Sequence, residues 1–165
     1  MGTAPRRLVI MRHAHAAQSP GTPDHERPLD ARGKAEAQQM GLWLAKNVPA
    51  EQIYFSSALR TVQTAELVVA QWESPVRCIP DRGMYGAEAA ELVELVKTID
   101  DDIVTAVLIG HQPAMHDVVE QLSNDRADRF PPGTAAILEF TGEWDSIESA
   151  QARLSQVVYV ADLPG

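Results

Sequence analysis

The sequence predicts an α/β fold, a three-layer α/β/α sandwich with a mostly parallel central sheet. Short apolar runs typical of buried strands alternate with segments whose apolar residues recur at the three- and four-residue spacing of helices. Such alternation is the pattern of strand–helix–strand units, which form parallel sheets with helices on the faces. The length of 165 residues suits one core, so we expect a single domain over residues 1–165.

The first half of the chain is expected to contain two strand–helix pairs separated by a loop. Proline and polar residues exclude a regular helix from the stretch after the first strand. Asp30 then offers a side-chain oxygen that can cap the first helix. The expected elements are a strand at 8–11, a loop at 18–27, a helix at 30–47, a strand at 53–55 and a helix at 59–72.

The second half is expected to add two further strand–helix pairs and an antiparallel edge. A turn signal at 130–133 separates the last two strands from the alternating pattern. The expected elements are a brief strand at 77–79, a helix at 87–98, a strand at 105–109, a helix from Pro113, and strands at 135–141 and 157–161.

Composition and charge exclude several classes of partner. A formal net charge of −9 argues against general binding to nucleic acid or to anionic membranes, because the field repels polyanions. The longest apolar runs cannot span a bilayer, and the run after Arg6 and Arg7 is too short for an export signal. Cys78 is the single cysteine, which fits a reducing compartment. We therefore expect a cytoplasmic protein.

Histidines and arginines stand where the predicted strands end. Arg12 and His13 follow the first strand, Arg60 follows the second, and His111 follows the strand at 105–109. In open α/β sheets, ligands bind outside the carboxyl ends of the strands, so these side chains are expected to meet in one crevice. The sequence therefore predicts an anion site.

These residue types suit the transfer of a phosphoryl group. A neutral ring nitrogen can attack phosphorus when cations hold the phosphate in line, and we expect His13 to be this nucleophile. Arg12 and Arg60 can clamp the phosphate oxygens with paired donors. His111 is expected to donate to the charge that develops in the transition state, aided by the helix that starts at Pro113.

Four motifs resemble one known family. They are Arg12-His13-Ala14, Arg27-Pro28-Leu29 followed by Gly33, the segment from Ser56 to Ala65, and Gly110-His111-Gln112-Pro113. In this order they resemble the histidine phosphatase superfamily, which has the phosphoglycerate mutase-like fold, and more narrowly its SixA-type phosphohistidine phosphatases. The resemblance implies a phosphohistidine intermediate on His13, a phosphate pocket completed by Arg12, Arg60 and His111, and no need for a metal or other cofactor.

The sequence departs from the family pattern at two places. Ala14 follows His13, where many members have glycine. Larger relatives carry an acidic proton donor after the third strand, and here that region offers only Glu88, a candidate donor or substrate-binding residue. A phosphoramidate depends less on an enzyme acid, because its imidazole can be protonated before it leaves. This favours phosphohistidine as the substrate.

Several alternatives remain open. Arg27 either contacts substrate or pairs with nearby Asp24 or Glu26, and His13 with His15 offers the spacing of a metal pair without a supporting acidic cluster. The expected partner is a phosphorylated protein, most simply one that carries phosphohistidine. The alternative functions are a phosphomonoesterase for a small metabolite and a non-catalytic domain that binds phosphorylated segments. A mutase is less favoured, because no contacts to a second phosphate are identified.

Overall fold

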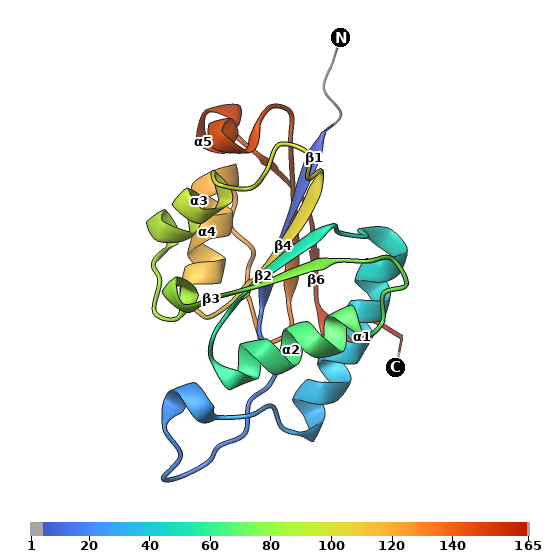
Figure 1. Cartoon of the computed structure of the whole chain (residues 1–165), viewed down its shortest axis with the longest axis vertical. Coiled ribbons are helices and arrows are strands. Elements are labelled where there is room, and N and C mark those ends of the chain that lie inside the picture. Colours follow the sequence, from blue (N-terminus) through green and yellow to red (C-terminus); the bar gives the residue numbers. More distant parts are fainter. Residues whose placement is uncertain (1–4, 165) are drawn as a thin grey trace.

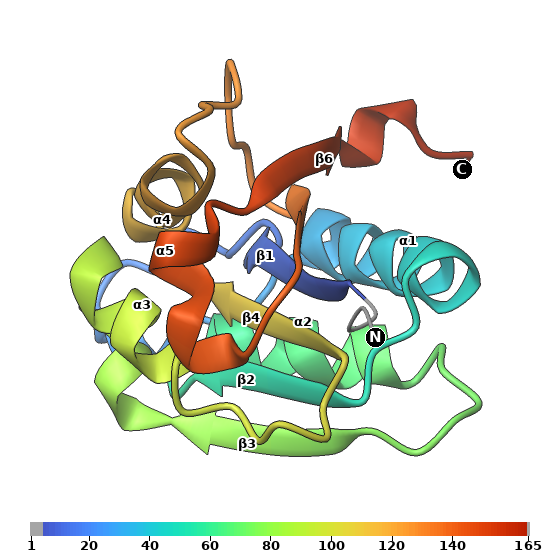
Figure 2. The same ribbon diagram turned by 90° about the horizontal axis from the view of Figure 1, so that it is seen from above.

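A six-stranded sheet in the order β3-β2-β4-β1-β5-β6 forms the centre of the protein (Figures 1 and 2). The structure is a computed structural model and describes residues 5–164. The strands are β1 (Arg6–Arg12), β2 (Gln52–Ser56), β3 (Arg77–Asp81), β4 (Thr105–Gly110), β5 (Ala135–Phe140) and β6 (Arg153–Val158). The helices are α1 (Ala31–Asn47), α2 (Leu59–Val69), α3 (Ala89–Val96), α4 (Ala114–Ser123) and α5 (Ile147–Ala150), with a short 3-10 helix, η1 (Asp24–Glu26), before α1.

The sheet is mixed, with a parallel part and an antiparallel edge. Strand β4 lies between β1 and β2 and is parallel to both, and β3 extends the parallel part beyond β2. Strand β5 pairs antiparallel with β1, and β6 pairs antiparallel with β5. The predicted fold class is confirmed, including the antiparallel strands expected after residue 130.

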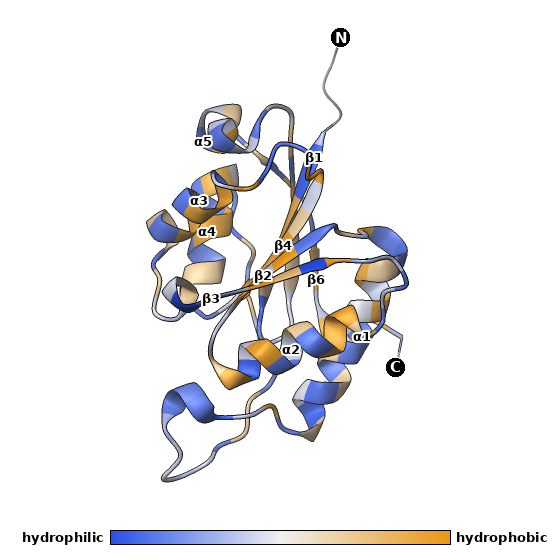
Figure 3. Ribbon diagram, viewed as in Figure 1, coloured by the Kyte–Doolittle hydropathy of each residue, from blue (hydrophilic) through white to orange (hydrophobic). Residues whose placement is uncertain are grey.

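Helices cover both faces of the sheet, and each face has its own apolar core. On one face, strand residues such as Val9 and Ile109 pack with Met40 of α1 and Val68 of α2. On the other face, Leu108 and its neighbours pack with residues of α3 and α4. Figure 3 shows the hydrophobic colour concentrated on the central strands and on the inward sides of these helices. All residues of β4 are buried, as expected for a strand covered on both faces.

Some boundaries differ from those predicted. Helix α2 ends at Val69 rather than residue 72, and α3 covers 89–96 rather than 87–98. The strand expected at 157–161 is wrong in position, because β6 starts at Arg153 and residues 160–162 form a 3-10 helix. Polar, partly exposed residues in this edge strand conceal its start from an apolar pattern. Within residues 5–164, no helix is long and apolar enough to cross a membrane.

Candidate active site

The carboxyl ends of β1, β4 and β2 bring the predicted residues together. Arg12 pairs with Gly110 in the parallel ladder, and the His13 N–H donates to the Gly110 carbonyl at 3.0 Å. The His13 and His111 rings follow these two neighbouring strands, and their centroids are 5.3 Å apart. The rule that ligand sites form at strand ends therefore locates the two histidines correctly relative to each other.

The His13 ring is held as one neutral tautomer. Its Nδ1 atom lies 2.7 Å from the Ala14 carbonyl oxygen. A carbonyl only accepts, so Nδ1 carries the hydrogen and Nε2 carries a lone pair. Burial lowers the pKa of His13 to about 3. The hydrogen bond to the Ala14 carbonyl raises this pKa, whereas the nearby His111, Arg60 and Arg12 lower it further. The ring is therefore uncharged near neutral pH, and its Nε2 lone pair can accept or attack.

Ala14 is accommodated by close packing beside the nucleophile. Its side chain is fully buried in a small cluster with Leu29 and Ala37. Its N–H donates to the Thr64 hydroxyl at 3.1 Å, and that hydroxyl donates to the Arg60 carbonyl at 2.7 Å. The methyl group at this position thus fits the site, and Thr64 links the segment after β1 to the start of α2.

The His111 ring is oriented by Ser56 at the end of β2. Its Nε2 atom lies 2.8 Å from the Ser56 hydroxyl oxygen, which also accepts from the Ala58 N–H at 3.3 Å. With Ser56 donating to Nε2, the hydrogen of a neutral ring is on Nδ1, which is buried and has no partner among the described residues. Burial and then the Arg60 charge lower the pKa of His111 to about 4. In that tautomer, a neutral His111 can donate from Nδ1.

Arg60 lies in the first turn of α2 and contacts a carboxylate from the loop after β1. One terminal nitrogen donates to Asp24 Oδ2 at 3.0 Å, and the other donates to the Asp24 carbonyl at 2.7 Å. The Tyr85 hydroxyl donates to the same Oδ2 atom at 2.6 Å. This bond, with those from Arg60 and Arg27, holds the pKa of Asp24 well below its usual range.

Three buried side-chain nitrogens of the site have no hydrogen-bond partner among residues 5–164. They are the Nε groups of Arg12 and Arg60 and Nδ1 of His111. Arg12 also donates from a terminal nitrogen to the Phe130 carbonyl at 3.1 Å, which fixes its side chain. Buried donors are seldom left without acceptors in proteins, so this group of donors suits an anion with several oxygens.

The two secondary candidates, Arg27 and Glu88, are placed differently. Arg27 donates to Asp24 Oδ1 at 3.1 Å and to the Ala17 carbonyl at 3.2 Å, so the ion pair with Asp24 is formed. Glu88 is exposed and precedes α3, where its N–H donates to the Glu91 carboxylate at 3.1 Å. The structure thus brings Arg27 to the site through Asp24, whereas the described polar contacts of Glu88 belong to the start of a helix.

The sequence pattern missed several residues that build the site. Ser56 ends a predicted strand, so the same strand-end rule could have identified it. Asp24 and Tyr85 gave no such signal, because Asp24 lies in the short 3-10 helix η1 and Tyr85 in a turn, and neither follows the end of a predicted strand. Gln63 accepts from the Leu29 N–H at 2.8 Å and so braces the loop after β1.

His15 makes a separate interaction with α1. Its Nδ1 atom lies 2.8 Å from the carboxylate oxygens of the buried Glu36. His13 instead directs Nδ1 to a backbone carbonyl, so the two rings are engaged by different partners. In the part of the chain that the structure describes, no three His, Cys, Asp or Glu side chains gather as a metal site.

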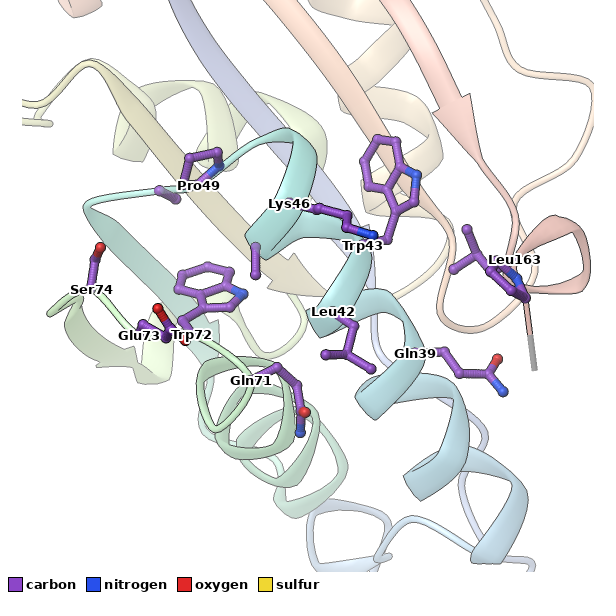
Figure 4. Close-up of a pocket in the computed structure, with 13 residues that line it drawn as sticks. Gln39, Leu42, Trp43, Lys46, Pro49, Gln71, Trp72, Glu73, Ser74 and Leu163 are labelled. Atoms are coloured by element: carbon purple, nitrogen blue, oxygen red, sulfur yellow. The ribbon is translucent and has the colours of Figure 1, made fainter.

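A cavity of about 650 Å³ lies away from these residues. It is formed by the C-terminal half of α1, the turn that follows α2 and the chain near Leu163, and Trp43, Trp72 and Leu42 line it (Figure 4). None of the predicted site residues lines this cavity. The site at the strand ends is instead covered by the loop that carries η1, which lies beside the start of α2 (Figure 1).

Proteins of two mycobacteria are similar to this chain over most of its length. An uncharacterized protein of Mycobacterium leprae is 34% identical over 158 residues, covering 87% of this chain and 96% of the relative. An uncharacterized protein of Mycobacterium tuberculosis is 33% identical over 155 residues, with the same two coverages of 87% and 96%.

The most informative structural similarities are to SixA proteins. A candidate phosphohistidine phosphatase SixA from Nakamurella multipartitia is 27% identical, with a TM-score of 0.86 over 96% of this chain and 98% of that one. The protein histidine phosphatase SixA in complex with tungstate shares the fold at 21% identity and a TM-score of 0.82, covering 94% of this chain and 98% of its own. The family model of the histidine phosphatase superfamily, branch 1, matches residues 8–83. With the relatives that extend the match over most of its length, this chain belongs to the histidine phosphatase superfamily.

Proposed function

We propose that this protein is a phosphatase that removes phosphate from histidine on a protein partner, through a covalent phosphohistidine on His13. The observation that carries the proposal is the fixed tautomer of His13, whose Nδ1 atom is bound to the Ala14 carbonyl. The lone pair on Nε2 is then available beside Arg12, Arg60 and His111. The SixA proteins of similar fold are by name a candidate phosphohistidine phosphatase and a protein histidine phosphatase, which supports the same substrate class here.

In the first step, Nε2 of His13 attacks the phosphorus of the bound phosphohistidine. A new P–N bond forms to His13 while the P–N bond to the substrate imidazole breaks, and its electron pair returns to the leaving ring. Arg12, Arg60 and the Nδ1–H of His111 donate to the three peripheral oxygens, where transition-state charge is spread. No proton is required when the leaving ring already carries a hydrogen on its other nitrogen.

In the second step, water attacks the phosphorus of the phosphorylated His13. The P–N bond breaks, its electron pair returns to Nε2, and both water protons remain on the released phosphate. The Ala14 carbonyl keeps Nδ1–H in place throughout, so the ring returns to the tautomer that began the cycle. In this scheme the protein's own donors balance the phosphate charge, and we propose that turnover is independent of metal.

Rapid-quench labelling with a ³²P-phosphohistidine protein tests the proposal. We expect acid-labile, alkali-stable label on the wild type and release of phosphate, and neither with His13→Ala, because the attacking nitrogen is lost. His15→Gln is the matched control, since it removes the neighbouring imidazole and should keep the label. A chelator should leave the rate unchanged.

Each other outcome points to a different function. A near-normal rate with His13→Ala would remove His13 from the role of nucleophile. Turnover of simple phosphate esters, without turnover of phosphohistidine, would indicate a phosphomonoesterase for small metabolites. Binding of the phosphorylated protein without label or release would indicate a non-catalytic interaction domain. Inhibition by the chelator would indicate a metal requirement.

A further inference from the structure

The proposed reaction leaves one well-fixed charge of the site without a role, the Asp24 carboxylate. Three side chains from separate parts of the chain hold it: Arg60, Tyr85 and Arg27, at 3.0, 2.6 and 3.1 Å. A surface carboxylate that served only to neutralise Arg27 would need none of the long-range contacts. This convergence indicates that the position of Asp24 at the site is specified by the fold.

The loop that carries Asp24 is tied down at its base and near its tip. Residues 16 and 29 form an antiparallel bridge, and the Ala17 N–H donates to the Pro28 carbonyl at 2.8 Å. Near the tip, the His25 Nε2 atom lies 2.9 Å from the Ser57 hydroxyl, and its ring packs edge-on against Tyr85 at 4.8 Å. The loop therefore presents Asp24 in a defined place.

Asp24 lies on the outer side of the site. His13 is only 8% exposed, whereas the Asp24 side chain is 54% exposed. Tyr85 connects Asp24 to the histidines of the site, because its ring packs edge-on against His111 at 5.5 Å and its hydroxyl donates to Asp24. In-line attack expels the leaving group on the side of the phosphorus opposite the nucleophile. A leaving ring that belongs to a protein partner must depart toward solvent, and Asp24 is exposed to solvent.

We propose that Asp24 determines specificity, because its carboxylate selects phosphoryl donors whose leaving group is a protonated, cationic ring and disfavours donors whose leaving group is anionic. The inference rests on the proposed function and deepens it. The leaving imidazolium would donate its N–H to the carboxylate, which keeps that proton on the ring. When the P–N bond breaks, the electron pair neutralises the ring, and imidazole departs without any proton transfer from the protein.

The same carboxylate is unsuited to phosphate esters. An ester leaves as an alkoxide and needs a proton, and Asp24 is kept ionised by Tyr85, Arg60 and Arg27. A carboxylate on the leaving group, as in a phosphorylated hydroxy acid, would also be repelled by Asp24. The charge of Asp24 thus favours phosphoramidates over phosphate esters as substrates. It disfavours esters with an anionic leaving group most strongly.

The test compares kcat/KM for three small substrates: phosphoimidazole, p-nitrophenyl phosphate and 3-phosphoglycerate. Asp24→Asn keeps the shape of the side chain and removes its charge. We expect kcat/KM to fall about tenfold for phosphoimidazole, the loss of one charge-assisted hydrogen bond, and to rise for 3-phosphoglycerate. Glu26→Gln is the matched control, because it removes one charge from the same loop, and we expect all three values to stay within about twofold.

Tyr85→Phe provides a second variant that keeps the charge. It removes only the hydroxyl that holds Asp24, so we expect a smaller shift of the same sign in the ratio of phosphoimidazole to 3-phosphoglycerate. An equal change for all three substrates in Asp24→Asn would overturn the inference, because it would mean that Asp24 only competes for Arg60. A wild type that releases phosphate neither from these three substrates nor from a phosphohistidine protein would overturn the proposed function, and the inference with it.

Discussion

Two neutral histidines side by side are the central feature at the scale of the residue. An imidazole near pH 7 can be charged or uncharged, and phosphoryl transfer to His13 requires the uncharged form. Burial beside two arginines favours the uncharged form of both rings, because it lowers the pKa of His13 to about 3 and that of His111 to about 4. In the proposed reaction, the two arginines that would hold the phosphate also help burial to keep His13 uncharged.

These lowered pKa values predict a loss of stability in acid. In the unfolded chain both histidines bind protons below about pH 6.5, whereas the folded protein resists protonation until about pH 4 for His111 and about 3 for His13. The contribution of the two histidines to the free energy of unfolding is complete above pH 6.5. It is lost as the pH falls toward their folded-state pKa values, with a slope of up to about 1.4 kcal/mol per pH unit for each histidine.

Urea unfolding at pH 7.5 and 5.0 measures this effect. Between these two pH values, we expect the free energy of unfolding of the wild type to fall by about 1–2 kcal/mol more than that of His111→Asn. The variant lacks one of the two histidines that resist protonation in the folded protein. Carboxylates that titrate in this range contribute equally to both proteins and cancel in the difference. Parallel losses in the two proteins would show that His111 is readily protonated in the folded state.

Residues at strand ends could be predicted from the sequence, and residues that reach the site from loops could not. Arg12, His13 and His111 follow apolar runs directly, so the parallel sheet fixes where they lie. The bond from Arg60 to Asp24 joins residues 36 positions apart, and that from Tyr85 joins residues 61 positions apart. No periodic pattern encodes such contacts, because they depend on how an irregular loop folds over the sheet.

Helix α1 is the element on which the position of this loop depends. Its first turn is capped by Asp30, which accepts from the Gly33 N–H at 2.7 Å, as the sequence predicted. Gly33 itself faces the segment after His13, and a Cβ atom built on it would lie 2.0 Å from the His15 carbonyl oxygen. The glycine of the family motif is thus required for close packing of the helix against the segment that carries the nucleophile.

Gly33→Ala is therefore expected to be costly although alanine favours helix. The neighbour is backbone, which moves less readily than a side chain, so we expect a loss of about 1–3 kcal/mol in the free energy of unfolding. Lys34→Ala, at the next and exposed position, should change the same quantity by less than about 0.5 kcal/mol. Chemical denaturation of the two variants makes the comparison, and equal stabilities would mean that α1 can shift without cost.

Elements with a clear apolar period were predicted well, and the edge strand β6 was not. Helices α1 and α4 and strand β4 bury continuous stripes or runs, so their patterns are strong. Strand β6 is an edge strand in which only Val158 is fully buried. Its pairing with β5 is set by tertiary contact rather than by its own composition, which is why its start was misplaced.

At the scale of the whole molecule, an acidic protein carries a predicted anion site. The formal net charge is −9, so the long-range field opposes the approach of phosphate, and only the local donors of Arg12, Arg60 and His111 can favour it. Salt screens the long-range field more than contacts within a buried site. Binding of a small oxyanion should therefore tolerate salt better than binding at an exposed basic surface would.

Tungstate, a tetrahedral oxyanion, tests the site through the stability of the whole fold. An anion that binds only the folded state stabilises it by RT ln(1 + [L]/Kd), about 2.7 kcal/mol at one hundred times Kd. For a chain of this size, that energy corresponds to a rise in Tm of roughly 5–10 °C.

Arg60→Ala should remove most of this rise in Tm, because the anion loses a buried cation. Arg77→Ala removes an exposed arginine on the edge strand β3 and should leave the rise in Tm intact. Thermal unfolding with and without tungstate gives the answer for all three proteins. An equal rise in all three would place the anion elsewhere, since the fold would then gain stability without using the donors at the ends of β1, β2 and β4.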